Sequence, residues 1–139
     1  VVYMRNCYII DEPQKLFSFE HKDLTKSPSQ RNNLRYGNRT FHPQIDCICH
    51  GFAGYFEATL YDKIKISTVP ATYSQDMFSW FPIWIPLKEP VFLKANEPLK
   101  VHFWRQLNSR SVWYEWCLSE PVITCIQNPN GRSHNIGLF

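Results

Sequence analysis

Short segments in which apolar and polar residues alternate, each bounded by Pro, Asn, Ser or Gly, cover most of this chain. The clearest is Leu99–Gln106, where Leu99, Val101 and Phe103 fall on one face and the intervening residues fall on the other. Alternation with a period of two is typical of a half-buried β-strand. The ten prolines and the 16% aromatic content argue against long helices.

The same pattern predicts about nine or ten short, mostly antiparallel strands, and hence an all-β barrel or sandwich. Because 139 residues are about one domain in length, we expect a single domain over residues 1–139. Residues 22–38 are polar and predict a long loop or arm, a kind of segment that is often functional. The expected strands are 1–10, 16–21, two within 45–61 with a bend at Gly51 and Gly54, 64–67, 81–85, 91–94, 99–106, 112–118, 122–126 and a last strand or docked tail at 133–139, with turns at 62–63, 68–79, 108–111 and 128–131.

Composition and glycine spacing exclude several classes of function. The net charge of +3 is far from that of a nucleic-acid-binding arm, and no apolar run approaches the ~20 residues that span a bilayer. The five glycines form neither of the Gly-rich loops that hold nucleotide phosphates. We therefore expect no direct contact with nucleic acid and none with a membrane.

The five cysteines have no regular spacing, which favours free thiols in a reducing compartment over a disulfide framework. Cys47-x-Cys49-His50 resembles the first half of a metal site, but a closed zinc site needs a second pair of ligands, and none follows. We therefore expect no metal, and small buried thiols instead.

No arrangement of Ser, His and Asp forms a recognisable catalytic motif. His102 lies in the clearest strand, where we expect it to be structural. Across the following hairpin, Glu115 and Arg105 are expected to form a structural salt bridge. The Gly51-x-x-Gly54 spacing resembles an RNA-clamp loop but lacks flanking helices, so it predicts a strand bend where another backbone approaches closely.

The most unusual local sequence is Met77-Phe78-Ser79-Trp80-Phe81-Pro82-Ile83-Trp84, which concentrates aromatic residues after a polar loop. Phe78, Trp80 and Trp84 share one parity and Phe81 the other, so one set can pack a core while the loop tip presents a ring outward. An exposed Trp face suits flat or cationic ligands such as a base, a sugar ring or a guanidinium. From the residues alone, core packing and a binding role both stay open.

Several segments, in this order along the chain, together resemble the C-terminal barrel of the symmetric (type II) protein arginine methyltransferases. The resemblance spans nearly the whole chain and is strongest from His50 to Ile83 and from Phe103 to the end. The segments are His50–Glu57, Met77–Ile83, Phe103–Arg105, Val112–Trp116 and Asn128–Ser133.

This resemblance implies an enzyme that transfers methyl groups from S-adenosylmethionine to arginine side chains, giving monomethylarginine and symmetric dimethylarginine. In the family, the cofactor site and the catalytic glutamates lie in a Rossmann-like domain that precedes the barrel. We therefore expect that domain upstream, and we expect this chain to hold no catalytic or cofactor-binding residue and to be inactive alone.

The resemblance also implies partners and a location. The implied partners are arginine-containing protein substrates, such as histones and Gly-Arg-rich RNA-binding proteins, and further copies of the enzyme in a homodimer or higher oligomer. A WD-repeat partner of the family docks mainly on an N-terminal domain, which this sequence does not include. The implied location is the cytoplasm and nucleus, with a role in chromatin regulation.

By the same resemblance, the loop Phe78–Phe81 reaches into the active site. Trp80 is expected to stack on the substrate guanidinium, Ser79 to contact the glutamate-bearing loop, and Phe81 to line the pocket partly through its backbone. A dimer-contact segment of the family corresponds to Asn32, Asn33, Arg35 and Tyr36, within the polar loop of residues 22–38, with Leu34 as an additional residue in the pattern.

Two alternatives come from other classes of protein. An aromatic-rich β-sandwich would grip sugars or methylated peptides through an exposed Trp, which predicts tight ligand binding by this chain alone. A purely structural oligomerisation domain would bury Trp80 in its core, which predicts that Trp80→Ala lowers stability by about 3–5 kcal/mol.

Overall fold

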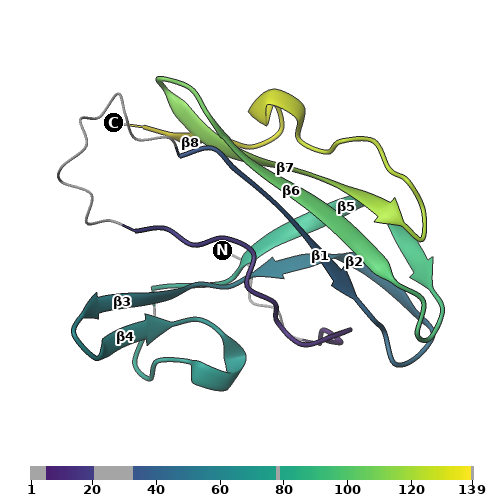
Figure 1. The fold of residues 1–139 in the computed structure, drawn as a ribbon, viewed down its shortest axis with the longest axis horizontal. Helices are drawn as coiled ribbons and strands as arrows, with labels where there is room; N and C mark the ends of the chain where they lie inside the picture. The colour runs from purple at the N-terminus through teal and green to yellow at the C-terminus, as the bar shows by residue number, and fades with distance from the viewer. Residues whose placement is uncertain (1–5, 21–32, 78, 139) are drawn as a thin grey trace. The chain divides into compact units, whose positions relative to one another are not determined.

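Strands dominate the structure, a computed structural model that describes residues 6–20, 33–77 and 79–138 (Figure 1). The expected all-β class is confirmed, and the only helical segments in these ranges are the 3-10 turns η2 (Pro70–Thr72) and η3 (Pro129–Gly131). The described ranges contain eight strands, which are β1 (Arg35–Phe41), β2 (Cys47–Gly54), β3 (Glu57–Tyr61), β4 (Ile64–Ser67), β5 (Ile83–Leu93), β6 (Leu99–Leu107), β7 (Ser111–Glu120) and β8 (Ile136–Gly137).

The described residues form two compact units. One unit holds the residues up to Ile9 together with Ile48–Phe92, and the other holds Ile10–Cys47 together with the residues from Leu93 onward. The second unit contains a four-stranded sheet in the order β1-β6-β7-β8, and two-stranded sheets pair β2 with β5 and β3 with β4. The first unit therefore consists mainly of short ladders, whereas the second is built on one larger sheet.

The four-stranded sheet is antiparallel throughout, and β1, β6 and β7 lie side by side in Figure 1. As the alternation predicts, Leu99, Val101 and Phe103 of β6 are almost completely buried. Leu118 of β7 is paired opposite Val101 and is also fully buried. Burial of each such side chain contributes about 1.5–3 kcal/mol, so this face is the core of the second unit.

The β6–β7 connection is the expected hairpin turn. The N–H of Asn108 donates to the carbonyl of Ser111 at 2.9 Å. The Asn108 side-chain oxygen accepts the N–H groups of Arg110 and Ser111, each at 2.8 Å. An Asn side chain that bonds the backbone two residues onward stabilises such a turn locally.

The prediction of a strand at 122–126 is wrong. Thr124 N–H donates to the Leu118 carbonyl at 3.1 Å, but the Leu118 N–H donates to the Thr124 hydroxyl at 2.9 Å. A side chain thus replaces one of the carbonyls that a regular ladder needs. The isolated bridge between Trp116 and Gln127 lies just beyond this segment.

The turn at 128–131 and a docked tail after it are both confirmed. Asn128 and Asn130 have φ angles of 54° and 55°, a left-handed region that Asn tolerates. The Asn128 side chain accepts the N–H groups of Ser133 at 2.9 Å and His134 at 3.0 Å, and donates to the carbonyls of Tyr114 and His134, each at 2.8 Å. The tail then pairs with β7 through β8.

The N-terminal part of the chain differs from its prediction. The described residues of the strands expected at 1–10 and 16–21 form no strand, whereas residues 35–38, expected in a loop, belong to β1. Residues 11–15 are tied to β1 and the residue after it by side chains. Gln14 Nε2 donates to Thr40 O at 2.8 Å, Arg39 Nε donates to Lys15 O at 2.6 Å, and Asp11 accepts the His42 N–H at 2.8 Å. These bonds replace the regular ladder that the alternation predicts.

β5 is one strand of eleven residues, where two strands at 81–85 and 91–94 were expected. It continues through Pro86 and Pro90, residues that predict a strand edge or a bend. Because β5 pairs only with β2 in the described part of the chain, it is an edge strand, where the missing N–H of proline is tolerated. The β3–β4 hairpin and its Asp62-Lys63 turn agree with the prediction.

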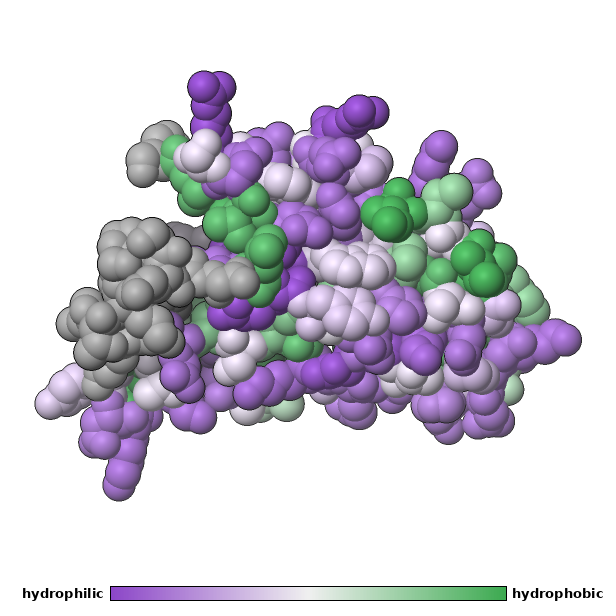
Figure 2. Space-filling view, turned by 45° about the horizontal axis from the view of Figure 1, so that its top comes forward, coloured by the Kyte–Doolittle hydropathy of each residue, from purple (hydrophilic) through white to green (hydrophobic). Residues whose placement is uncertain are grey.

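Many large apolar side chains remain exposed. On the face drawn in Figure 2, hydrophobic side chains (green) gather in separate groups among hydrophilic ones (purple). Two groups are local in sequence: Leu60, Tyr61 and Ile64 at the β3–β4 turn, and Val122, Ile123 and Ile126 after β7. No helix within the described ranges is long and apolar enough to cross a membrane.

Gly51 confirms the predicted close approach of two backbones. Its φ is +156°, and a Cβ added there would lie 2.4 Å from the carbonyl oxygen of Ile85 in β5. A side chain at this position would therefore clash with backbone that cannot rotate away.

We predict that Gly51→Ala lowers the free energy of unfolding by about 2 kcal/mol or more, because β2 and β5 must separate to admit the methyl group. Gly54→Ala is the matched control, since its Cβ would lie 3.7 Å from Ile83, an ordinary contact. Urea-induced unfolding of both variants measures the difference. Equal losses in the two variants would contradict the proposed clash.

Candidate functional site

The aromatic loop at residues 79–81 leads directly into β5 and carries an exposed tryptophan. The Trp80 ring packs edge-on against Phe56, with ring centroids 5.4 Å apart and an interplanar angle of 62°. Trp80 is 55% exposed, Ser79 is also exposed, and Phe81 is half-buried. One aromatic contact thus orients the Trp80 indole and leaves much of it accessible to a ligand.

The backbone of Phe56 is held in turn by Thr68. The Phe56 N–H donates to the Thr68 hydroxyl at 2.9 Å, and the Thr68 N–H donates to the Phe56 carbonyl at 2.9 Å. Thr68 is buried, so water competes weakly for these bonds. The platform under Trp80 is therefore fixed by the main chain.

Buried Ser67 organises the turn that precedes the loop. Its N–H donates to the Ser74 hydroxyl, and the Ser74 N–H donates back to the Ser67 carbonyl, each at 3.0 Å. The Ser67 hydroxyl lies 2.8 Å from the hydroxyl of Thr72 and accepts the N–H of Val69 at 3.1 Å. The segment predicted to be turn-like is thus a hydrogen-bonded connection that delivers the chain to the aromatic loop.

The exposure of Trp80 argues against its burial in a core. Phe78 lies outside the described residues, so the structure does not address the parity argument that paired it with Trp80. The geometry is compatible with the roles expected of Ser79, Trp80 and Phe81, which stay predictions.

The second candidate site is the start of β1, which holds most of the expected dimer-contact residues; Asn32 lies outside the described part. Tyr36 is 54% exposed, and its ring centroid lies 5.3 Å from that of Trp104 in β6. Its hydroxyl is 2.8 Å from Nδ1 of His102, whose Nε2 is 2.9 Å from the Ser119 hydroxyl. Both ring nitrogens of His102 therefore have partners, as expected of a structural histidine.

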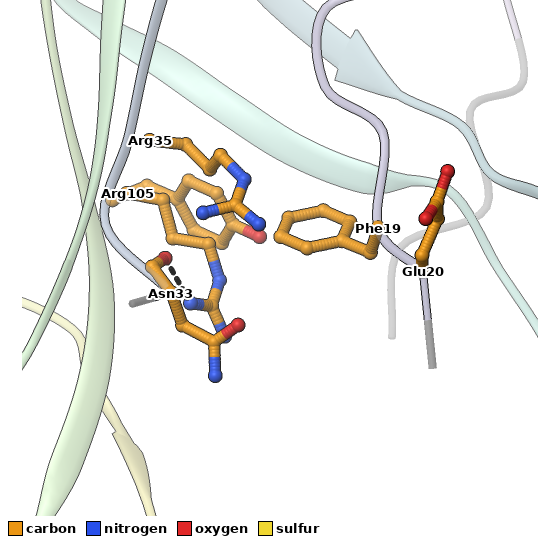
Figure 3. Close-up of a pocket in the computed structure, with 6 residues that line it drawn as sticks. Phe19, Glu20, Asn33, Arg35 and Arg105 are labelled. Carbon is orange, nitrogen blue, oxygen red and sulfur yellow. Dashed lines mark hydrogen bonds between the residues drawn. The ribbon is translucent and has the colours of Figure 1, made fainter. Parts of the chain in front are cut away.

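Arg35, at the first position of β1, lines a pocket on the other face of the sheet (Figure 3). Its guanidinium carbon lies 5.2 Å from the centroid of the Phe19 ring, and that of Arg105 lies 5.3 Å from the same ring. Arg105 also donates to the backbone carbonyl of Asn33 at 2.7 Å. The pocket has a volume of about 310 Å³ and is lined by Phe19, Glu20, Asn33, Arg35, Arg105 and Tyr114.

The prediction of a salt bridge between Arg105 and Glu115 is wrong. In the β6–β7 register, Arg105 is opposite Tyr114 and Glu115 is opposite Trp104, so the two charged side chains lie on opposite faces. Glu115 instead accepts the indole N–H of Trp113 at 2.8 Å and the N–H of Asn130 at 2.7 Å. The error was one residue of register, which reverses the face of a strand residue.

The cysteines are free thiols in different environments. Burial raises the pKa of the Cys117 thiol above its ordinary value. Burial and, to a lesser extent, the charge of Asp46 raise the pKa of Cys47. Among the described residues, no group of three or more His, Cys, Asp or Glu side chains could hold a metal ion.

The described residues do not fit a site for S-adenosylmethionine. Their helical segments are three-residue 3-10 turns, and neither follows a Gly-rich loop of the kind that opens a nucleotide-binding helix. No chemical step is therefore assigned to a cofactor bound by this chain.

Reasoning from the sequence missed the pocket beside the dimer-contact segment. It placed Phe19 in a strand, Arg105 in a salt bridge and residues 33–36 in a loop. The useful signal was the register of β6 with β1, which pairs Arg105 with Arg35. This register can be inferred only after β1 has been recognised as a strand. Because the sequence of β1 is polar, the strand was not recognised.

The chain matches known proteins over nearly its whole length. A family model described as the PRMT5 oligomerisation domain matches residues 1–136. The chain is 40% identical to "Protein arginine N-methyltransferase 5" of Xenopus laevis over 138 residues, which cover 99% of this chain and 21% of that protein.

Relatives from other kingdoms match similarly. Identity is 46% over 142 residues with "Protein arginine N-methyltransferase skb1" of Schizosaccharomyces pombe, covering 91% of this chain and 23% of that protein. It is 42% over 128 residues with "Protein arginine N-methyltransferase 5" of Oryza sativa subsp. indica, covering 90% of this chain and 19% of that protein. The chain thus spans about a fifth of the length of these relatives.

We predict that Trp80→Ala lowers the free energy of unfolding by about 1 kcal/mol, because the exposed ring loses mainly its contact with Phe56. Leu118→Ala, at a fully buried position, is expected to lower it by about 2–5 kcal/mol. Denaturant titration of the two variants measures both values. A loss in Trp80→Ala as large as that in Leu118→Ala would place Trp80 in a core.

We predict that iodoacetamide modifies Cys47 and Cys117 more slowly than the exposed Cys125 near pH 8. A raised thiol pKa leaves less of the reactive thiolate at a given pH, and burial limits access. Mass spectrometry of a time course measures each rate, and the rates should converge in denaturant. Faster modification of Cys117 than of Cys125 in the folded protein would contradict the described burial.

Proposed function

The chain belongs to the family of PRMT5 oligomerisation domains, and from this premise we propose that it supplies the self-association surface and one wall of the substrate site of a protein arginine methyltransferase. The resemblance seen in the sequence is confirmed by the family match. Because the chain spans about a fifth of its relatives, the activity proposed is that of a larger protein to which it contributes.

Self-association is supported by the family description and by the exposed start of β1. Tyr36 presents an aromatic ring backed by Trp104, and aromatic residues are enriched in protein interfaces. We assign the contact between copies to Asn32, Asn33, Arg35 and Tyr36. The resulting assembly is a homodimer or a higher oligomer.

Exposed apolar residues support the same proposal from another direction. Leu60, Tyr61 and Ile64 form a local group at the β3–β4 turn, and Val122, Ile123 and Ile126 form a second one. Large exposed apolar side chains that lie near one another are a feature of surfaces that a partner covers. Under this proposal, the remainder of the enzyme and further copies of it cover these surfaces.

The substrate role rests on one observation, the exposed and oriented indole of Trp80. A guanidinium is a planar cation and is attracted to the face of an aromatic ring, most strongly to that of tryptophan. Stacking also fixes the plane of the guanidinium, so that a terminal nitrogen meets the methyl donor in line. Ser79 beside it contacts the loop that carries the catalytic glutamates, and Phe81 lines the pocket partly through its backbone.

The finer assignments are part of the same proposal and rest on the resemblance to the family. S-adenosylmethionine, held by the upstream Rossmann-like domain, supplies the methyl group, and the product is symmetric dimethylarginine. Substrates are arginine-containing proteins such as histones and Gly-Arg-rich RNA-binding proteins. A WD-repeat partner docks on the N-terminal domain, and the enzyme works in the cytoplasm and nucleus.

We predict that Trp80→Ala in the full-length enzyme lowers kcat/KM for a Gly-Arg-rich peptide by about 100-fold, because the guanidinium loses both attraction and orientation. Phe92→Ala removes another aromatic side chain of similar exposure, outside the surfaces assigned to partners, and should leave kcat/KM within about twofold. Methyl transfer from labelled S-adenosylmethionine measures both.

Full activity in Trp80→Ala would remove Trp80 from the mechanism and leave self-association as the role of the chain. Tight binding of a sugar or methylated peptide by the chain alone would favour the binding-module alternative.

A further inference from the structure

We propose that Asn130 is a modification site, at which loss of ammonia and uptake of water convert the side-chain amide into a carboxylate when the turn at 128–131 leaves β7. The starting point is the dipeptide Asn130-Gly131, the one Asn-Gly pair in the chain. Because glycine has no side chain, its backbone nitrogen is open to close approach by the preceding residue. This chemistry goes beyond the function proposed above and needs no partner protein.

The reaction requires water as its one co-reactant. The Gly131 nitrogen attacks the side-chain carbon Cγ of Asn130, so that an N–Cγ bond forms and the Cγ–Nδ2 bond breaks. Ammonia leaves with the proton of the Gly131 N–H, and the product is a succinimide ring. Water then opens one of the two ring C–N bonds. Opening at Cγ gives aspartate, whereas opening at the original peptide bond gives isoaspartate, which has an extra methylene in the main chain.

The backbone of Asn130 prevents ring closure while the turn is folded. Closure requires Cβ of Asn130 and the nitrogen of Gly131 to be nearly eclipsed about the Cα–C bond. The φ and ψ angles of Asn130 are 55° and 27°, which place these two atoms on nearly opposite sides of that bond. Asparagine tolerates this left-handed conformation. The Asn130 side chain is therefore exposed to water but kept away from the nitrogen that attacks it.

The Gly131 peptide is held in place as well. Its N–H donates to the Asn128 carbonyl at 3.0 Å, and its own carbonyl accepts the side-chain amide of Asn135 at 3.0 Å. Gly131 is buried, and a Cβ added there would lie 2.9 Å from Cγ of Trp113. A buried, hydrogen-bonded N–H gives up its proton when its segment opens, as in hydrogen exchange. The opening that permits exchange at Gly131 therefore also permits deamidation of Asn130.

Glu115 connects the product to the state of the turn. Its Oε1 accepts the Asn130 N–H at 2.7 Å and the Trp113 indole N–H at 2.8 Å. A new carboxylate on residue 130 repels that of Glu115, because like charges at short range repel. Isoaspartate also lengthens the main chain beside Gly131, where Trp113 leaves no room for a methyl group. The modified turn thus binds β7 less tightly, and one opening makes later openings more frequent.

The test follows the Asn130 amide of the full-length protein by peptide mass spectrometry during incubation at mildly alkaline pH. The folded protein should deamidate at least about tenfold more slowly than the same protein in urea, because unfolding frees the Gly131 N–H. Asn108, which precedes Ser109, is an internal reference. In urea it should react more slowly than Asn130, because the serine side chain hinders attack by its nitrogen.

A pair of variants tests the role of the turn. Glu115→Ala removes the acceptor of the Asn130 N–H, and we expect about fivefold or faster deamidation in the folded protein. Glu97→Ala is the matched control, since Glu97 is also half-buried and accepts a backbone N–H, that of Lys94, outside the turn. Its deamidation rate should stay within about twofold of wild type.

A milder variant covers the case in which Glu115→Ala does not fold. Asn135 is exposed, so Asn135→Ala removes only its hydrogen bond to the Gly131 carbonyl, and it should speed deamidation about threefold or more. Hydrogen exchange in the peptide 128–135 should rise together with the deamidation rate. Circular dichroism and the melting temperature establish folding for every variant.

Each outcome decides the proposal. Faster deamidation and faster exchange in Glu115→Ala and Asn135→Ala, but not in Glu97→Ala, would support it. An Asn130 amide that persists in urea would show that the site is unreactive and overturn it. Equal rates in the folded protein and in urea would remove the protection and also overturn it. Wild-type rates in the folded variants of the turn would show that the turn does not restrain the reaction, with the same consequence.

Discussion

The antiparallel ladder between β6 and β7 is the constraint on which the larger unit depends. It places Val101 opposite Leu118 in the buried core and fixes, in the same register, which residues face away from that core. β1 adds to one side of this ladder, and β8 adds to the other. The C-terminal turn depends on it too, because Asn128 docks on the carbonyl of Tyr114. Because the side-chain period of a strand is two, a change of one residue in this register would exchange core and surface together.

The smaller unit is stabilised in a different way. Its buried residues include Ser67 and Thr68, whose hydroxyls bond to backbone groups of neighbouring segments. Satisfied polar groups of this kind specify geometry, because each bond has a direction, whereas apolar contacts alone tolerate sliding. The result is a loop of defined shape that keeps an aromatic side chain in solvent. A ring that must meet a partner has to be oriented without being buried, and hydrogen bonds to the backbone beneath it achieve this.

The sequence predicted elements well where local pattern and packing agree. The alternation of β6, the Asn-rich turns and the bend at Gly51 all follow from residues whose own preferences match their final environment. Prediction from the sequence failed where pairing between distant segments determines the structure. β1 is polar, and its strand geometry is imposed by pairing with β6. Residues 122–126 have the sequence pattern of a strand, but the Thr124 hydroxyl takes the place of a backbone carbonyl in their hydrogen bonding. The exposure of Trp80 was one of two open possibilities, and the pocket at Arg35 and Arg105 was missed because a cross-strand pair has no signature within either segment.

The environment of Trp113 has a consequence for following this protein in solution. Gly131 lies so close that a Cβ there would approach the indole to 2.9 Å. The same Glu115 oxygen accepts the Trp113 indole N–H and the backbone N–H of Asn130. Emission from an indole responds to its water contact and hydrogen bonding, so Trp113 is an intrinsic optical reporter of whether the C-terminal turn is seated on β7. Trp80, already in contact with water, reports instead on ligands and partners that cover it.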